Sequence, residues 1–203
     1  MKGAAKYNIA NALGAIGLAD ALGLSIDAVA SGLAGFTDSP DENPGRGNFI
    51  EVGGITLLID FAHNPHGILA LAEAVRDVPA TRRLFLAGQA GDRSDQDTRD
   101  MTRAIWAASP DAVVVKELPK KLRGRQLGEL PAIITDELHQ LGATEDQILL
   151  ADDEYQATRQ ALGWAQPDDL LVLLLHEDRA PVMDLIERLK AADWQAGKGT
   201  LPD

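Results

Sequence analysis

Cysteine is absent from the 203 residues, which excludes disulfides, a thiolate nucleophile and cysteine-ligated zinc. This absence fits a reducing compartment, and we expect the cytoplasm. Basic residues are in deficit, because 19 Lys and Arg stand against 31 Asp and Glu and give a formal net charge of -12. Such a charge repels nucleic acid and anionic membranes, so we expect neither as a partner.

Long apolar runs are also missing. The longest, Leu170 to Leu175, is far too short to span a bilayer, and no basic segment leads into an apolar run at the N-terminus. A composition of 45% hydrophobic and 25% charged residues is ordinary for a packed domain. We therefore expect a soluble protein with one main core and an appendage.

A phosphate loop is the third absence. The pattern G-x-x-x-x-G-K-[ST], whose backbone amides and lysine hold nucleotide phosphates, occurs nowhere in the sequence. We expect that the chain by itself does not hydrolyse ATP.

A helical pair is predicted at the start of the chain. Ala10 to Leu22 is rich in Ala and Leu and ends at Gly23, and Ser25 caps a second helix that runs to about Phe36. The polar stretch from Thr37 to Gly47 is typical of a linker.

The remainder is typical of an α/β domain. Gly53-Gly54 separates apolar runs at 49–52 and 55–60, which predicts a tight antiparallel hairpin. Strands are then predicted near 84–87, 112–116, 148–150 and 170–175, and helices near 66–77, 96–108, 128–141, 153–165 and 180–190. This alternation predicts a mostly parallel sheet with helices on both faces, followed by a loosely ordered tail.

Ionisable residues follow four of the predicted strands. They are Asp60, His63, His66, Asp92, Arg93, Lys116, Glu117, His176 and Glu177. Because the carboxyl ends of parallel strands lie at one edge of a sheet, near helix N-termini, this pattern predicts a ligand crevice there. The alternative is that these loops are polar because they are solvated.

Two clusters leave further alternatives open. His63 and His66 have the i, i+3 spacing of a metal chelate with Asp60, but no third nitrogen ligand is clustered nearby, so a metal-dependent hydrolase ranks last. The second cluster is a cationic run made up of Lys116, Lys120, Lys121, Arg123 and Arg125. It is either a solvated loop or a site for a carboxylate or phosphate.

Motifs occur along the chain in a definite order. The first are Asn8-Ile9-Ala10-Asn11-Ala12, Gly45-Arg46 and Asp60-Phe61-Ala62-His63-Asn64-Pro65. This series resembles the Mur ligases and the folylpolyglutamate synthases. The later segments Gly91-Asp92-Arg93, Lys116-Glu117, Leu122-Arg123-Gly124-Arg125 and Asp152-Asp153-Glu154 are most similar to the Mur-ligase-like C-terminal portion of cyanophycin synthetase.

The resemblance implies a domain organisation and a reaction. Residues 1–40 would be the last helices of a central ATPase domain, residues 41–192 a Rossmann-like C-terminal domain with one antiparallel strand, and residues 193–203 a tail. The family joins a carboxylate to an amine through an acyl phosphate made from ATP. We therefore expect ATP and Mg²⁺ as cofactors, magnesium ligands outside this chain, and N-terminal and central domains as partners.

The resemblance also implies residue roles. On the nucleotide side, Asn8 and Asn11 would face adenine, Arg46 the phosphates or ribose, Asp60 the ribose hydroxyls and Phe61 the base, with His63 and Asn64 lining the same mouth. An amino acid or peptide-like substrate would be bound or oriented by Asp92, Arg93, Lys116, Arg123, Arg125, His176 and Glu177. No catalytic residue is assigned.

The sequence departs from the family at the amine-binding run. Glu117-Leu118-Pro119-Lys120 stands where diaminopimelate-adding enzymes have Asp-Asn-Pro-Arg, which argues against a peptidoglycan substrate. The basic run instead suits an anionic substrate. A stand-alone domain that binds a nucleotide or anionic metabolite without catalysis is the alternative from a different functional class.

Overall fold

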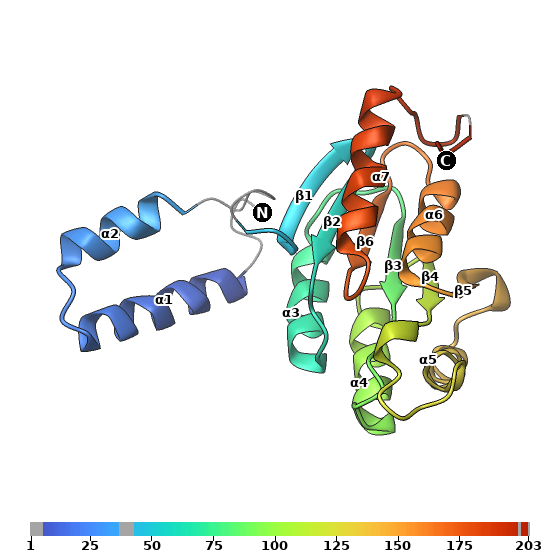
Figure 1. Cartoon of the computed structure of the whole chain (residues 1–203), viewed down its shortest axis with the longest axis horizontal. Coiled ribbons are helices and arrows are strands. Elements are labelled where there is room, and N and C mark those ends of the chain that lie inside the picture. The colour runs from blue at the N-terminus through green and yellow to red at the C-terminus, as the bar shows by residue number, and fades with distance from the viewer. Residues whose placement is uncertain (1–5, 37–42, 199, 203) are drawn as a thin grey trace.

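The computed structural model describes residues 6–36, 43–198 and 200–202. It consists of a helical pair beside a six-stranded mixed sheet that carries helices on both faces (Figure 1). The predicted fold class is confirmed. Residues 37–42 of the predicted linker lie outside the described residues.

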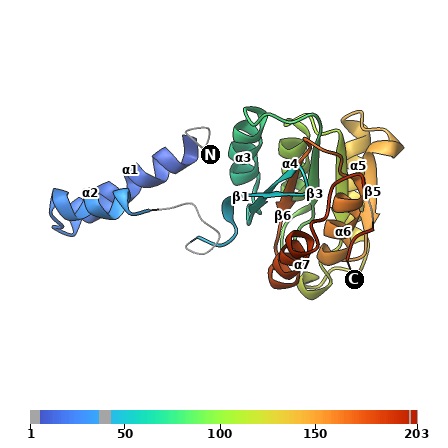
Figure 2. The ribbon, with the colours of Figure 1, turned by 90° about the horizontal axis from the view of Figure 1, so that it is seen from above.

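The helical pair consists of α1 (Lys6–Ala21) and α2 (Ile26–Ala34). Ser25 caps α2, and its hydroxyl accepts a hydrogen bond from the backbone N–H of Ala28 at 3.3 Å. Both helices project to one side of the sheet (Figures 1 and 2). No described side chain of the pair is buried, and several large apolar side chains are exposed, among them Ile9, Leu13, Leu18, Leu22, Leu24, Ile26 and Phe36. The pair therefore has no apolar core of its own.

The sheet contains β1 (Arg46–Val52), β2 (Ile55–Asp60), β3 (Arg83–Ala87), β4 (Ala112–Lys116), β5 (Ile148–Ala151) and β6 (Leu170–Leu174). Their spatial order is β1-β2-β6-β3-β4-β5. β1 pairs antiparallel with β2, and the other neighbours are parallel. The predicted hairpin is confirmed, with Gly53 and Gly54 in its turn at φ 56° and 80°.

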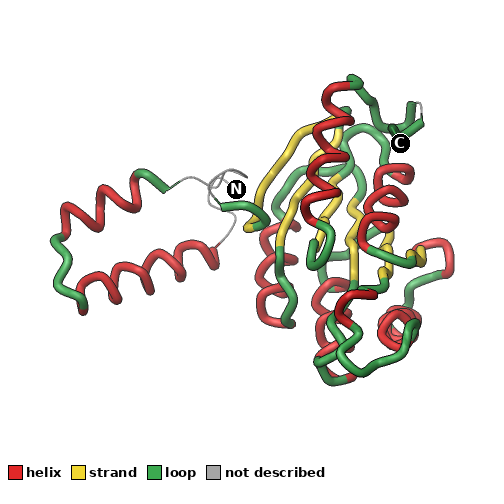
Figure 3. The backbone as a smooth tube through the Cα atoms, viewed as in Figure 1, coloured by secondary structure: helices red, strands yellow, loops and turns green. Residues whose placement is uncertain are grey.

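Five helices cover the two faces of the sheet (Figure 3). α3 (Pro65–Arg76), α4 (Asp95–Trp106) and α5 (Glu129–Gln140) pack on one face, and α6 (Glu154–Trp164) and α7 (Arg179–Ala191) pack on the other. Alternate residues of β2 serve the two layers, because Leu57 and Ile59 join the α6–α7 core whereas Leu58 joins the α3–α5 core. The predicted strands and helices are present with ends shifted by a few residues.

The strand order determines where the loops meet. β6 lies between β2 and β3 and runs parallel to both, so the carboxyl ends of these three strands are adjacent. The chain leaves β2 and β3 for helices on one face and leaves β6 for α7 on the other. In open α/β sheets, ligands bind where the connections of neighbouring strands diverge in this way.

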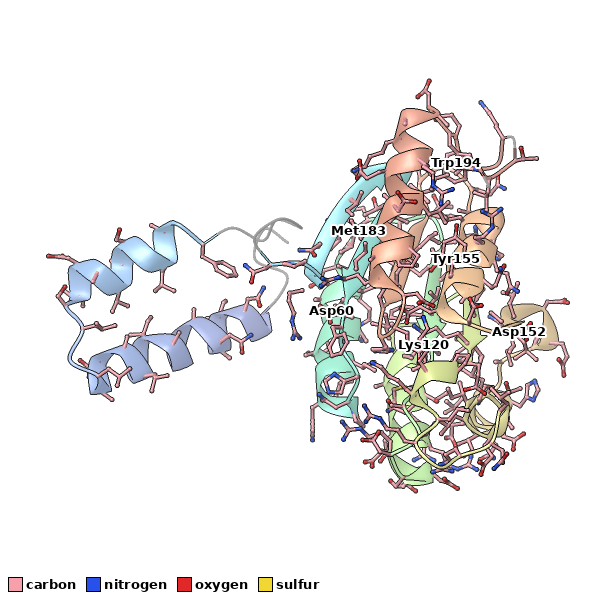
Figure 4. The ribbon with its side chains drawn as sticks, in the orientation of Figure 1. Asp60, Lys120, Asp152, Tyr155, Met183 and Trp194 are labelled. Atoms are coloured by element: carbon pink, nitrogen blue, oxygen red, sulfur yellow. The ribbon has the colours of Figure 1, made fainter. Side chains whose placement is uncertain are left out.

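The C-terminal segment packs against the opposite edge of the sheet, so the prediction of a loosely ordered tail is wrong for its described residues. Trp194 is 7% exposed, and the Ala196 N–H donates to the Gly53 carbonyl at 2.9 Å. Arg159 donates to the Pro202 carbonyl at 2.6 Å. Figure 4 shows Trp194 at the end of the domain away from Lys120. Among the described helices, none combines the length and apolarity needed to cross a bilayer.

Replacing Gly53 tests how closely the tail packs. A Cβ there would lie 2.5 Å from Trp194 Cε3, whereas at Gly54 the nearest atom, Pro167 Cβ, would be 3.9 Å away. Both positions have positive φ, so Gly54→Ala measures backbone strain alone. We expect Gly53→Ala to lower the free energy of unfolding by about 1–3 kcal/mol more than Gly54→Ala in urea titrations. Equal losses would show that Trp194 does not press on the turn.

Candidate functional site

A cleft of about 850 Å³ lies between the helical pair and the loop that follows β2. Its walls include all seven residues predicted for the nucleotide side, namely Asn8, Asn11, Arg46, Asp60, Phe61, His63 and Asn64. Leu33 of the helical pair, Phe36 just after it, and Gly67, Ala70 and Leu71 of α3 also line it. Figure 4 shows Asp60 on the side of the sheet that faces the helical pair. The roles of these residues stay predictions.

The loop after β2 is shaped by the start of α3. Asn64 caps this helix, and its side-chain oxygen accepts from the Gly67 N–H at 2.9 Å. Pro65 occupies the first turn, where its missing N–H removes no helical hydrogen bond. His63 Nδ1 lies 3.1 Å from the Phe61 carbonyl oxygen. These local bonds hold the side chains of the loop at the mouth of the cleft.

Asp60 ends β2 beneath this loop. Burial raises the pKa of its carboxyl group, while the Ala62 N–H, which donates to Asp60 Oδ1 at 2.6 Å, and the charge of Arg46 oppose that rise. Arg46 stands opposite Asp60 in the β1–β2 register. A half-buried carboxylate beside a guanidinium suits hydroxyl groups on one side and phosphate oxygens on the other.

Phe61 lies at the centre of the mouth. The Arg46 guanidinium lies 5.4 Å from its ring centroid, and the Lys121 ammonium lies 5.7 Å from it. The rings of His63 and His176 are 5.2 and 5.5 Å away from it, centroid to centroid. The loop after β2 therefore contacts the loop after β6 through this ring.

His176 begins the loop after β6. Burial and the nearby Lys116 ammonium lower the pKa of His176 to about 3, so its imidazole is neutral at pH 7. Its Nε2 lies 3.0 Å from the Ala62 carbonyl oxygen, which only accepts, so Nε2 carries the proton. Nδ1 is then an acceptor, and it is buried without a hydrogen-bond partner among the described residues.

Glu177 follows with an unsatisfied carboxylate. Both its oxygens are buried, and neither has a hydrogen-bond partner within the described part of the chain. Burial raises the pKa of Glu177, and repulsion from Glu154 adds to the rise. The nearby Lys120 backbone N–H lowers the pKa of Glu177, although its geometry does not meet that of a normal hydrogen bond. A buried carboxylate with no donor is unfavourable in the folded chain and is typical of a binding site.

The cations of the basic run make contacts within the chain. Lys120 forms an ion pair with Asp178, and Lys121 donates to the His176 carbonyl at 2.6 Å. Arg123 forms an ion pair with Asp92. Arg125 pairs with Asp95 at 2.7 Å and donates to the Arg93 carbonyl at 2.9 Å. The run therefore ties the loops after β3, β4 and β6 together.

Gly91 and Arg93 mark the loop after β3. The Gly91 backbone packs so closely on Leu122 that a Cβ would overlap the Leu122 carbonyl. Arg93 is half-buried, and its guanidinium has no salt bridge or hydrogen bond with another described residue. Together with Arg123 it lowers the pKa of the neighbouring Asp92, but its N–H donors have no hydrogen-bond partner among the described residues, unlike those of Arg123 and Arg125.

Lys116 and Glu117 lie deeper than predicted from the sequence. The Lys116 side chain is 0% exposed and its ammonium contacts Glu154 and the Leu174 carbonyl, so it has no surface with which to touch a substrate. Glu117 accepts from the N–H groups of Leu118 at 3.0 Å and Gly128 at 2.6 Å. Both side chains support the loops from within.

The two histidines of the suggested metal chelate face different surfaces. His63 lines the cleft, whereas His66 lines a shallow groove between α3 and α4 with Asp97 and Asp100. Among the described residues, no group of three or more His, Cys, Asp or Glu side chains is placed to hold a metal ion.

Several residues of the site had no sequence signal. Leu33 and Phe36 resemble ordinary apolar residues of an amphipathic helix, and only the position of the helical pair brings them to the cleft. Glu154 is one of three consecutive acids at a helix start, and its burial depends on a partner 38 residues away in sequence. Long-range pairing of this kind leaves no local pattern.

Residues 45–174 match the family described as "Mur ligase, glutamate ligase domain". The chain belongs to the Mur ligase family. The cyanophycin synthetase of Trichormus variabilis is 35% identical over 176 residues, which are 86% of this chain and 19% of that protein. This Mur ligase chain thus spans about a fifth of the length of that relative.

Solved structures share the fold. The UDP-N-acetylmuramate-alanine ligase MurC from Thermotoga maritima is 19% identical, with a TM-score of 0.63 over 92% of this chain and 38% of that chain. The MurF ligase from Thermotoga maritima in complex with ADP is 17% identical, with a TM-score of 0.55 over 86% of this chain and 36% of that chain.

The unpaired Glu177 carboxylate predicts that its removal stabilises the chain. Because burial raises its folded-state pKa, the destabilisation is absent below the ordinary carboxyl pKa and complete once the pH exceeds the folded-state pKa. We expect Glu177→Gln to raise the midpoint of thermal unfolding by about 2–4 °C at pH 7, equivalent to roughly 1 kcal/mol. The gain should vanish near pH 3. Calorimetric scans of both proteins across pH measure this, and a lower midpoint at pH 7 would show that Glu177 has an internal partner.

Proposed function

We propose that this chain supplies the C-terminal part of an ATP-dependent ligase that joins a carboxylate to an amine through an acyl phosphate. The observation that carries the proposal is the single cleft that gathers all seven nucleotide-side residues between the helical pair and the sheet. Membership of the Mur ligase family supports it. The cleft and the family membership support a bound nucleotide. We assign a second substrate to the adjoining loops after β3, β4 and β6.

On the nucleotide side, the cleft offers the groups that ATP requires. We assign Asp60 to the ribose hydroxyls and Arg46 to the phosphates or ribose, since these side chains stand opposite each other at its floor. Phe61 would pack on the base, and Asn8 and Asn11 would bind the adenine edge from the helical pair. The related MurF structure contains ADP, which supports a nucleotide in this fold.

On the amine side, two unsatisfied groups of opposite charge define the substrate. Within the described residues, Glu177 presents a buried carboxylate without a hydrogen-bond donor, and Arg93 presents a guanidinium without a hydrogen-bonded anion. An amino acid carries an ammonium and a carboxylate that complement them. We infer that the amine substrate is an amino acid or a peptide-like molecule, held by Glu177 through nitrogen and by Arg93 through oxygen.

The chain's residues would orient the reactants. ATP would transfer its γ-phosphoryl group to the substrate carboxylate and leave as ADP. The ammonium would lose a proton to water, and the neutral amine would attack the acyl phosphate, forming the amide with release of phosphate and a second proton. Glu177 would hold the incoming nitrogen, and the Phe61–His176 contact would keep nucleotide and amine side by side. The described residues offer no group of three metal ligands, so no step is assigned here to Mg²⁺.

The helical pair supports a place for this chain within a larger enzyme. Its apolar residues are exposed, and helices without a buried face are typical of a surface that another domain covers. We propose that residues 1–40 are the last helices of a central ATPase domain and residues 41–192 the C-terminal domain. The phosphate loop and magnesium ligands would come from the central domain.

A stand-alone binding domain is the second candidate. It is favoured by the cleft itself, because all seven nucleotide-side residues come from this one chain. The two candidates differ in affinity. A complete binding site holds the nucleotide alone, whereas a partial site lacks the contacts that a phosphate loop supplies.

Calorimetry on the isolated chain separates these candidates. We expect no ATP turnover and a dissociation constant for ADP in the millimolar range or weaker, because the phosphates lack their loop. A micromolar dissociation constant that Asp60→Ala weakens at least about tenfold would favour the stand-alone domain instead. Substantial ATP turnover by the pure chain would contradict the ligase proposal.

A chimera tests the ligase role directly. The matched segment of the Trichormus variabilis cyanophycin synthetase would be replaced by this chain, and ATP-dependent product formation measured. We expect Asp60→Ala to lower kcat/KM for ATP by about 10- to 100-fold, since a hydrogen bond to a charged group is lost. His66→Ala is the matched control, because His66 lies outside the cleft. A folded but inactive chimera, or equal losses in both variants, would contradict the assignment.

A further inference from the structure

Glu154 is the most heavily hydrogen-bonded carboxylate of the described structure. It begins α6 and its side chain is 0% exposed. Its Oε2 accepts from the His176 N–H at 2.6 Å, and its Oε1 accepts from the Glu177 and Asp178 N–H groups at 2.9 and 2.7 Å. The Lys116 ammonium donates to the same carboxylate.

These three N–H groups precede α7. The Asp178 N–H belongs to the start of the helix, whereas those of His176 and Glu177 lie in the loop just before it. The first N–H groups of a helix have no partner within it and carry its partial positive charge, which makes this end attractive to anions. Asp178, the N-cap of α7, makes no capping bond with its own side chain. Glu154 therefore supplies from another helix the anion that this end attracts.

Lys116 keeps this buried carboxylate neutralised. Burial alone would raise the pKa of Glu154, but the Lys116 ammonium and the backbone donors hold it below its ordinary value, so the group stays charged. Gly88 leaves room for the lysine, because a Cβ there would lie 2.7 Å from Lys116 Cγ. The pair is thus built into the packing between β4 and β6.

The bonds of Glu154 fix the backbone of His176, Glu177 and Asp178 from inside the domain. On its outer side, this loop is held by the hydrogen bond from the His176 ring to the Ala62 carbonyl. Lys120 also pairs with Asp178, and Lys121 donates to the His176 carbonyl. Every N–H of these three residues is satisfied internally, whereas the Glu177 carboxylate has no partner among the described residues. A backbone held in this way keeps Glu177 from turning outward into water.

We propose that Glu154 is the positioning residue of the amine side, which fixes the loop after β6 so that the Glu177 carboxylate stays desolvated and without an internal hydrogen-bond donor, in position to pair with a substrate ammonium. The proposal rests on the amine-binding role proposed above for Glu177. It gives Lys116 a supporting role, since Lys116 neutralises Glu154 and makes no bond to Glu177.

Amide hydrogen exchange on the full 203-residue chain tests the proposal. In Lys116→Met/Glu154→Met, which replaces the charged pair by apolar side chains of similar length, we expect the His176, Glu177 and Asp178 amides to exchange at least about tenfold faster. In Lys116→Met alone we expect a smaller increase than in the double variant, because Glu154 loses its counter-charge but still accepts all three bonds. Unchanged rates in a folded double variant would overturn the proposal.

Glu177 itself provides a second readout that a purely structural role would leave unchanged. The pKa of Glu177, followed by the ¹³C shift of its carboxyl carbon, should fall in the double variant because the loop opens to water. The lost repulsion from Glu154 and the lost attraction to Lys116 act on this pKa in opposite directions. Glu137→Gln is the matched control. Glu137 is a buried carboxylate in α5 that pairs with Arg99 and Arg103, so its loss should alter stability and leave both readouts unchanged.

If the double variant does not fold, Glu154→Gln tests the same proposal. This side chain keeps its size and one acceptor but offers an NH₂ group to the remaining N–H donors, so at least one of the three amides should exchange about tenfold faster. Retained protection at all three would contradict the proposal. Neither readout uses a nucleotide or an amine. A failed ligase assay would therefore not contradict the role of Glu154, and a negative exchange result would not contradict the ligase proposal.

Discussion

The position of β6 between β2 and β3 is the constraint on which the site depends. Parallel pairing on both sides brings the end of β6 next to Asp60 on one side and next to the loop after β3 on the other. The helices that follow these strands lie on opposite faces, so the loops separate as they leave the sheet. Nucleotide-side and amine-side residues are far apart in sequence. They lie close together here because β6, the last strand in the sequence, is placed between the earlier strands β2 and β3.

Electrostatics then organises the loops that this order brings together. The protein is acidic overall, yet its densest group of cations lies at the carboxyl edge and forms bonds within the chain. Ion pairs at an exposed surface contribute little to stability. Here Lys120 joins the loop after β4 to the loop after β6, and Arg123 and Arg125 join it to the segment after β3, which restricts the relative position of these loops. Arg93 and Glu177, whose side chains have no hydrogen-bond partner among the described residues, therefore lie among loops that are held in place. Preorganised groups of this kind bind ligands with less loss of conformational freedom.

Much of the fold was predictable because its signals are local. Paired glycines between two apolar runs identify a hairpin, and Ser25, Asn64 and Asp153 accept hydrogen bonds at helix starts, as residues of their type commonly do. The nucleotide-side residues were found from motif resemblance, and the structure gathers all seven of them. The strand order, the burial of Lys116 and the packing of Trp194 were not predictable, because each depends on a partner distant in sequence.

The antiparallel direction of β1 has a consequence for how the two bodies of the molecule are joined. A parallel first strand would start at the amino edge of the sheet, far from the site. β1 instead starts at the carboxyl edge, so the chain arriving from the helical pair reaches the sheet where Arg46 pairs with Asp60. The connecting segment thus ends in the wall of the cleft, and its length limits how widely the two walls can separate. An insertion or deletion in this segment would change the distance that the helical pair can keep from the sheet, while the pairing of β1 with β2 stayed the same.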